Sequence, residues 1–225
     1  MIRPECVWLT RHAETSAPHL FHGAESDVGL SDLGQRQALA AAEWFSHRQP
    51  TVVISSAMRR AVDTARPIAA RCACEHRVLS EWHERRIGSL SGTSFSVTEG
   101  AWPETVRRWA AGDIDYTTPG AESFRDLQTR LLAAWQQLQR ECAGERVVIV
   151  AHGVVCKVLL LSLLPGMGPQ NWIALGRVAN LAVSELRPTS EGTWHATQLL
   201  VLPEPVALLN TGVPPGIAER PRSEA

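Results

Sequence analysis

The amino-acid sequence predicts an α/β fold, a three-layer sandwich with a largely parallel central sheet and helices on both faces. Short runs rich in β-branched residues alternate with longer segments whose apolar residues recur at helical spacing. The run Arg146–Ala151 is apolar without alternation, which is typical of a strand buried on both faces of a parallel sheet. Together these features favour strand–helix–strand crossovers around one sheet.

Six segments have the length and composition of strands. In chain order they cover residues 6–10, 51–54, 76–79, 146–151, 178–186 and 193–201. Five other segments have the apolar spacing of helices. They cover residues 32–45, 58–71, 103–111, a longer segment that begins after Ser123, and 154–164.

Helix boundaries are indicated by capping residues and prolines. Ser31, Ser56 and Ser123 can each accept a hydrogen bond from a free N–H group at the start of the helix that follows. Pro67 lies inside the second helix, and we expect it to bend or interrupt that helix because proline has no N–H group.

Length and composition indicate a single domain. The chain has 225 residues, of which 44% are apolar and 20% are charged, as in an ordinary globular protein with its own core. We expect the domain to cover residues 1–202. Residues 203–225 are rich in Pro and Gly, and we expect them to form a loosely ordered tail.

The charge balance argues against some classes of partner. Lys and Arg number 22 against 23 Asp and Glu, so the basic excess of a nucleic-acid-binding protein is missing. The most apolar stretch, residues 147–164, contains His152 and Lys157, and a strand followed by a helix explains it better than a membrane span. The five cysteines have spacings that fit neither a disulfide framework nor a zinc site. With no signal-peptide segment at the start, we expect a cytoplasmic protein with no nucleic-acid or membrane partner.

Polar residues lie directly or shortly after the ends of three predicted strands. His12 follows residues 6–10, His152 follows residues 146–151, and Arg60 comes shortly after residues 51–54. Ligands of parallel sheets bind beyond the carboxyl ends of the strands, so we expect these side chains to converge. A neutral imidazole can attack phosphorus, and guanidinium groups bind phosphoryl oxygens. Each residue alone is more often structural, but their common position favours a phosphoryl-transfer site.

Four motifs, in this order, resemble those of the histidine phosphatase superfamily, the phosphoglycerate mutase-like proteins. Residues 11–15 (RHAET) are similar to its RHG(E)T signature, and residues 60–65 (RAVDTA) match its RAxxTA element. Residues 84–88 (ERRIG) are similar to its ExxxG segment, and residues 148–153 (VIVAHG) to its VxHG element. The resemblance covers roughly positions 5 to 185.

The resemblance implies a role for five residues. His12 would be the nucleophile that becomes phosphohistidine, and Arg11 and Arg60 would hold the phosphoryl oxygens. His152 would complete that pocket. Glu84 would be the general acid, which protonates the leaving oxygen and later accepts a proton from water. Because the cations are built into the protein, no metal ion and no cofactor are expected.

Two of these assignments have a rival nearby. Arg59 adjoins Arg60, but only Arg60 aligns with the RAxxTA element. Glu81 precedes Glu84, but only Glu84 stands four residues before a glycine, as the motif requires.

The chain also departs from the family pattern. Ala13 stands where the family has Gly, and its methyl group is tolerated if φ there is below zero. Pro18 replaces the usual Asn, which removes one polar contact, and the loop 23–27 is one residue longer than the common spacing.

The family contains phosphatases and mutases, and three functions stay open. A mutase usually has a lysine after the ExxxG segment, and residues 90–120 contain none. Residues 119–123 (PGAES) resemble the PGGES run of the phosphatase branch. We therefore expect a metal-independent hydrolase of a small phosphomonoester. The alternatives are mutase-type phosphoryl transfer and a non-catalytic phosphate-binding protein, and homodimerisation is a family-level expectation.

Overall fold

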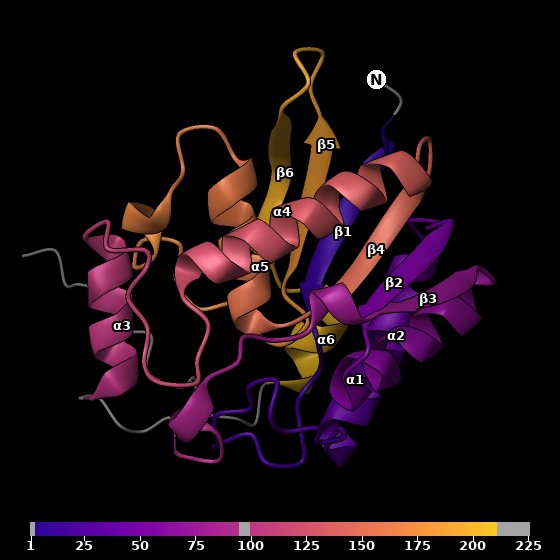
Figure 1. Ribbon diagram of the computed structural model, residues 1–225. Helices are drawn as coiled ribbons and strands as arrows, with labels where there is room; N and C mark the ends of the chain where they lie inside the picture. The colour runs from indigo at the N-terminus through magenta and orange to yellow at the C-terminus, as the bar shows by residue number, and fades with distance from the viewer. Residues whose placement is uncertain (1–2, 95–99, 211–225) are drawn as a thin grey trace, which may run out of the picture.

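A six-stranded sheet in the order β3-β2-β4-β1-β5-β6 forms the centre of the computed structural model, which describes residues 3–94 and 100–210 (Figure 1). The strands are β1 (Cys6–Arg11), β2 (Val52–Ser56), β3 (Glu75–Leu79), β4 (Arg146–Ala151), β5 (Val183–Pro188) and β6 (Trp194–Val201). Strands β1 to β4 are parallel to one another, whereas β5 runs antiparallel to β1 and β6 antiparallel to β5. The predicted largely parallel sheet is confirmed.

Helices cover both faces of this sheet. They are α1 (Asp32–Ser46), α2 (Arg59–Cys72), α3 (Ala101–Ala110), α4 (Phe124–Glu141), α5 (Gly153–Leu163) and α6 (Glu204–Leu209). Three short 3₁₀ turns are η1 (Ser80–Trp82), η2 (Gly88–Leu90) and η3 (Pro169–Asn171). In Figure 1, α4 and α5 pass in front of the sheet.

Successive strand residues point to opposite faces, so the sheet separates two apolar cores. Val52 and Ile149 belong to the core beneath α4 and α5, and Trp109 of α3 joins them there. Val53 and Val148 belong to the core beneath α1 and α2. Burial on both faces explains why the central strand β4 is a continuous apolar run, and the two cores confirm the three-layer architecture.

The expected capping residues are correct in two of three cases. Ser31 Oγ accepts a hydrogen bond from Gly34 N–H at 2.9 Å, and Ser123 forms a capping box with Asp126. The prediction for Ser56 is wrong, because Ser56 ends β2 and the residue that precedes α2 is Met58. Helix α2 continues past Pro67 to Cys72.

The fifth predicted strand begins too early. Residues 178–182 form a turn in which Leu181 has a φ of 58° and donates its N–H group to Arg11 O at 3.0 Å. Strand β5 starts only at Val183, where pairing with β1 begins. An apolar sequence alone cannot distinguish this buried turn from a strand.

Residues 203–210, which the sequence analysis assigns to a separate tail, continue the packed structure. Helix α6 contacts α1, and Val206 is buried in the core beneath α1 and α2. Gln37 Nε2 donates to Asn210 Oδ1 at 2.8 Å. The rest of the expected tail, residues 211–225, lies outside the described residues. In the part of the chain that is described, no helix has the length and apolar character needed to cross a membrane.

Gly34 allows α1 to approach the segment that follows β1. A Cβ atom at this position would lie 2.0 Å from Glu14 O, two residues after His12. The close approach therefore helps to place the start of the loop that carries His12.

Replacing Gly34 with Ala is expected to lower the free energy of unfolding by about 2 kcal/mol or more, because the added methyl group meets main-chain atoms. In an unconstrained helix interior the same change would raise stability by roughly 1 kcal/mol. Urea unfolding followed by circular dichroism measures the difference, with Gln35→Ala at an exposed neighbouring position as the control. A G34A protein as stable as the wild type would contradict the close packing.

Candidate active site

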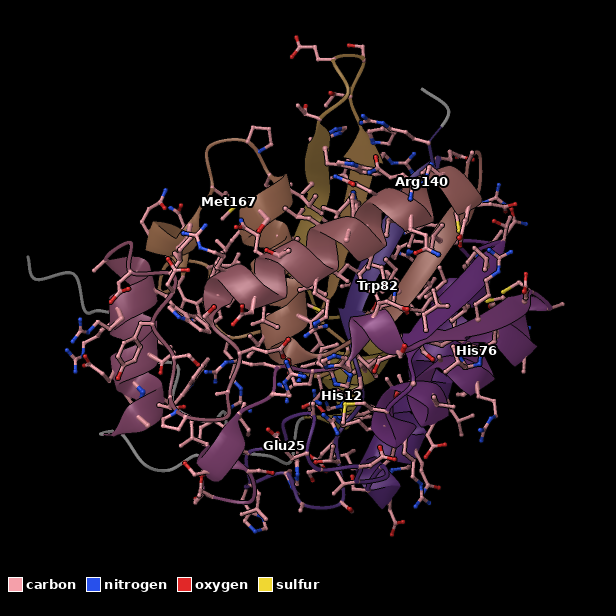
Figure 2. All side chains as sticks on the ribbon, viewed as in Figure 1. His12, Glu25, His76, Trp82, Arg140 and Met167 are labelled. Atoms are coloured by element: carbon pink, nitrogen blue, oxygen red, sulfur yellow. The ribbon has the colours of Figure 1, made fainter. Side chains whose placement is uncertain are left out.

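Two imidazoles lie side by side at the carboxyl end of neighbouring parallel strands. Strands β1 and β4 pair in register up to Arg11 and Ala151, so His12 and His152 are the next residues of each. His12 N–H donates to Ala151 O at 2.9 Å, and the ring centroids of the two histidines are 5.3 Å apart. Figure 2 shows His12 near the end of β1.

The orientation of the His12 ring determines which of its nitrogens carries the proton. Its Nδ1 lies 2.7 Å from Ala13 O. Because a carbonyl oxygen can only accept, Nδ1 carries the proton and Nε2 carries the lone pair. In the neutral ring, Nε2 is therefore the nitrogen with the free lone pair.

The main chain around His12 is held by side chains from two other segments. Asn180 Nδ2 donates to His12 O at 2.8 Å. Ala13 N–H donates to Thr64 Oγ1 at 3.0 Å, and the Thr64 hydroxyl donates to Arg60 O at 2.7 Å. The turn that carries His12 is thus tied to α2 and to the turn before β5.

Main-chain carbonyl groups hold the guanidiniums of Arg11 and Arg60. Arg11 Nη1 donates to Val178 O at 2.9 Å. Arg60, which is fully buried, donates from Nη1 to Ser26 O at 2.7 Å and from Nη2 to Gly23 O at 3.2 Å. In both residues the buried Nε has no hydrogen-bond partner among the described residues.

His152 lies in the same environment, fully buried. Neither of its ring nitrogens has a hydrogen-bond partner within the described part of the chain. Buried polar groups are nearly always paired, so a cluster of unpaired buried nitrogens with two guanidiniums among them is typical of a site that takes an anionic ligand. The N-terminus of α5, which begins one residue later, adds the positive end of a helix dipole.

Burial and positive charge keep both histidines neutral. Burial lowers the pKa of His12 well below its usual value, and the charges of Arg11 and Arg60 lower it further. Burial likewise lowers the pKa of His152, with Arg60 as the next cause. Burial also lowers the pKa of Arg11, to about 10, so this guanidinium remains charged at neutral pH. Neutral imidazoles and charged guanidiniums are the protonation states that nucleophilic attack on a phosphoryl group needs.

Glu84 and its rival Glu81 differ in position. Glu84 is 8% exposed, and its Oε2 accepts from Val154 N–H at 3.3 Å, at the start of α5 beside His152. Its Oε1 accepts from Arg85 N–H at 2.9 Å. Glu81 is exposed, and the structure brings Glu84 rather than Glu81 to the site.

The departures from the family pattern are accommodated. Positive φ angles in non-glycine residues of the described chain occur at four positions, and Ala13 is not one of them. Its methyl group is buried in the core beneath α1 and α2. Pro18 is exposed. The loop after it is fastened by Glu25, whose carboxylate accepts from Ile87 N–H and Gly88 N–H at 2.9 Å each (Figure 2).

Three contributors to the site are absent from the sequence analysis. Asn180 lies in residues predicted to be a strand, and no local pattern indicates its contact with His12. Arg130 binds the main chain near Glu84 from the middle of α4, where its sequence position is that of an ordinary surface arginine. No sequence pattern indicates the contact of Glu25 with the main chain of Ile87 and Gly88. Within residues 3–94 and 100–210, no three His, Cys, Asp or Glu side chains are grouped so that they could hold a metal ion.

Comparisons with known proteins agree with this architecture. The sequence profile of the histidine phosphatase superfamily (branch 1) matches residues 7–199. A metal-independent phosphoserine phosphatase of Arabidopsis thaliana is 35% identical over 161 residues, 69% of this chain and 67% of the relative. A glucosyl-3-phosphoglycerate phosphatase of Mycolicibacterium vanbaalenii is 33% identical over 187 residues, 79% of this chain and 82% of the relative. The solved structure of a mycobacterial glucosyl-3-phosphoglycerate phosphatase has a TM-score of 0.74 at 29% identity, covering 88% of this chain and 99% of that chain.

The fold and these relatives define an α/β phosphatase. The chain belongs to the histidine phosphatase superfamily, branch 1, and is a phosphoric monoester hydrolase. The phosphatase relatives confirm the expectation of a phosphoric monoester hydrolase.

The two buried imidazoles make stability depend on pH. Folding lowers both pKa values, so the unfolded chain binds more protons than the folded chain below its own histidine pKa of about 6.5. Their contribution is therefore complete above that pH and is lost as the pH falls toward the folded pKa values. The limiting slope is about 1.4 kcal/mol per pH unit for each imidazole.

We expect a His152→Gln variant to lose less unfolding free energy than the wild type between about pH 7.5 and 5.5, by roughly 1 kcal/mol. Urea unfolding at both pH values measures the two losses. His195→Gln on β6, where the histidine is exposed, is the matched control substitution. An H152Q protein with the wild-type dependence would contradict a buried neutral His152.

Proposed function

We propose that this chain is a metal-independent phosphomonoesterase that acts through a phosphohistidine at His12 on a small phosphorylated metabolite. The observation that carries the proposal is the neutral imidazole of His12, with Nε2 as its lone-pair nitrogen, 5.3 Å between ring centroids from the buried His152. The unpaired buried Nε donors of Arg11 and Arg60 supply the charge complement of a phosphoryl dianion, and neutral His152 adds a ring N–H group without a partner.

In the first step the phosphoryl oxygens accept hydrogen bonds from Arg11 Nε, Arg60 Nε and one ring N–H group of His152. His12 Nε2 then attacks phosphorus. The bond from phosphorus to the ester oxygen breaks as the N–P bond forms, and protonated Glu84 gives its proton to the departing oxygen. Fixed cations stabilise the charge on the transferring group, which is usually the largest contribution to such catalysis.

In the second step water attacks the phosphorus of phosphohistidine. The Glu84 carboxylate accepts a proton from this water, and the N–P bond breaks to release inorganic phosphate. His12 returns to its neutral form, and Glu84 is again protonated for the next cycle. Division of the reaction into two transfers replaces one difficult displacement with two easier ones.

The substrate class follows from the relatives. Their names identify phosphoserine and glucosyl-3-phosphoglycerate as substrates of those proteins. A panel of phosphorylated metabolites that includes both compounds is the direct screen for this chain. The proposal requires turnover of at least one small phosphomonoester.

Replacing His12 with Ala is expected to lower turnover of p-nitrophenyl phosphate on the order of 10³-fold or more, because the covalent route is lost. The wild-type protein, freed of metal with EDTA, should retain its turnover and give a phosphorylated peptide containing His12 when quenched in alkali and examined by mass spectrometry. His19→Ala, at an exposed loop position, is the control. Substantial turnover by H12A, or activity that EDTA abolishes and Mg²⁺ restores, would reject the proposal.

Replacing Glu84 with Gln is expected to lower kcat/KM for an alkyl phosphate by about 10²-fold or more, since the alkoxide leaving group requires a proton. The loss for p-nitrophenyl phosphate should be less than about 10-fold, because nitrophenolate leaves with little protonation. Steady-state kinetics with glycerol 2-phosphate and p-nitrophenyl phosphate give the two ratios. Equal losses for the two esters would remove the acid role from Glu84.

A further inference from the structure

A nearly buried ion pair lies at the beginning of α4, next to the segment that carries Glu84. Glu122 accepts from Arg130 at two points, with Nε 3.1 Å from Oε1 and Nη2 3.2 Å from Oε2. The side chains are 4% and 18% exposed, so solvent and salt screen this pair little. A two-point contact of this kind fixes the plane of the guanidinium relative to the carboxylate.

The remaining terminal nitrogen of Arg130 binds the main chain just before Glu84. Nη1 donates to Glu81 O at 2.8 Å and to His83 O at 3.1 Å. One guanidinium therefore holds two carbonyl groups within three residues of the proposed acid.

Glu122 binds the main chain just after Glu84. Its Oε2 accepts from Arg86 N–H at 2.8 Å, and its own N–H group donates to Arg86 O at 2.9 Å. The side chain of Arg85 adds a contact of 2.7 Å from Nε to Glu122 O. The ion pair thus fastens the chain on both sides of Glu84.

The direction of the Glu84 carboxylate depends on where this main chain lies. Oε1 accepts from the neighbouring Arg85 N–H at 2.9 Å, which ties the carboxylate to its own segment. Oε2 reaches Val154 N–H of α5 at 3.3 Å, a long hydrogen bond that would not hold the segment in place by itself. A shift of the segment would move the carboxylate relative to His12 and His152.

A buried ion pair is by itself weak support for stability, because desolvation of both charges offsets their attraction. Here every hydrogen bond that Arg130 makes outside the pair goes to a carbonyl group beside Glu84. We propose that Glu122 and Arg130 are positioning residues that hold Glu84 at the distance from the phosphoryl group that proton transfer requires. The proposal rests on the acid role given to Glu84 above.

The contact between Arg130 and the segment before Glu84 can be removed while the core packing of that segment remains. Trp82, between the two residues whose carbonyl groups bind Arg130, is 1% exposed and packs in the core beneath α4 (Figure 2). This anchor does not depend on the ion pair. We therefore expect variants of Arg130 to fold, with a displaced acid.

The test is the ratio of kcat/KM for glycerol 2-phosphate to kcat/KM for p-nitrophenyl phosphate. Arg130→Gln is expected to lower the alkyl value by about 10- to 10²-fold and the aryl value by less than about 3-fold, since a small misplacement of an acid costs rate only where the proton is needed. Glu122→Gln, which keeps the shape of the side chain, should change the ratio in the same direction. Arg130→Lys, with the charge but without the planar fork, should fall between Gln and wild type.

Two controls separate positioning from general damage. Arg140→Gln, an exposed arginine in the last turn of α4, should leave the ratio and both rates unchanged (Figure 2). In a Glu84→Gln background, Arg130→Gln should produce no further change in the ratio, because the group that it positions is already lost. Thermal melting of each variant checks folding, and E122Q and R130K supply the same comparison if R130Q does not fold.

The outcomes distinguish the two proposals. If E84Q discriminates between the esters but the Arg130 and Glu122 variants lose both rates equally, the positioning role is overturned and the acid role stands. If R130Q changes the ratio further in the E84Q background, Arg130 acts elsewhere and the positioning role is again overturned. If E84Q itself does not discriminate, both proposals fail.

Discussion

Buried positive charge at the carboxyl edge of the sheet is the constraint on which the rest of the structure depends. Arg60 is fully buried and Arg11 half-buried, and removal of a charged group from water costs several kcal/mol when it is complete. The hydrogen-bond partners that offset this cost are carbonyl oxygens of Val178, Ser26 and Gly23. Carbonyl groups satisfy the N–H donors without neutralising the formal charge. The edge therefore keeps a positive potential that a phosphoryl dianion matches.

The same charges govern the protonation state of His12. Burial lowers the pKa of His12, and the two nearby guanidiniums lower it further. The ring is therefore neutral at neutral pH. Its Nδ1 proton is committed to Ala13 O, which leaves Nε2 as the only basic nitrogen. The positive potential of this edge and the neutral state of His12 thus have one physical origin. Because these histidines are buried in the neutral form, the protein loses stability at acid pH.

Loops without regular structure acquire their conformation from these buried side chains. Arg60 gathers the carbonyl groups of residues 22–26, and Arg11 fixes the turn before β5, where Leu181 adopts a left-handed φ. Arg130 does the same for the segment before Glu84. A guanidinium with several donors in one plane can hold several carbonyl groups at once, and lysine cannot reproduce this geometry. Arg rather than Lys at these positions therefore has a structural reason.

The sequence by itself determined the alternation of strands and helices, the buried character of β4 and the position of His12 and His152 beyond their strands. Each of these features is indicated by a local pattern of a few residues. The parallel sheet then brings the strand ends together. The acid role of Glu84 is predicted from the resemblance to the ExxxG motif, which the spacing of Glu84 to Gly88 supports. Only the tertiary structure decided where β5 begins, that residues 203–210 pack against α1, and that Glu122 and Arg130 surround Glu84. These contacts join residues far apart in the chain. Some of them use main-chain groups, which every residue possesses, such as Glu81 O and Arg86 N–H, so no local side-chain pattern indicates them.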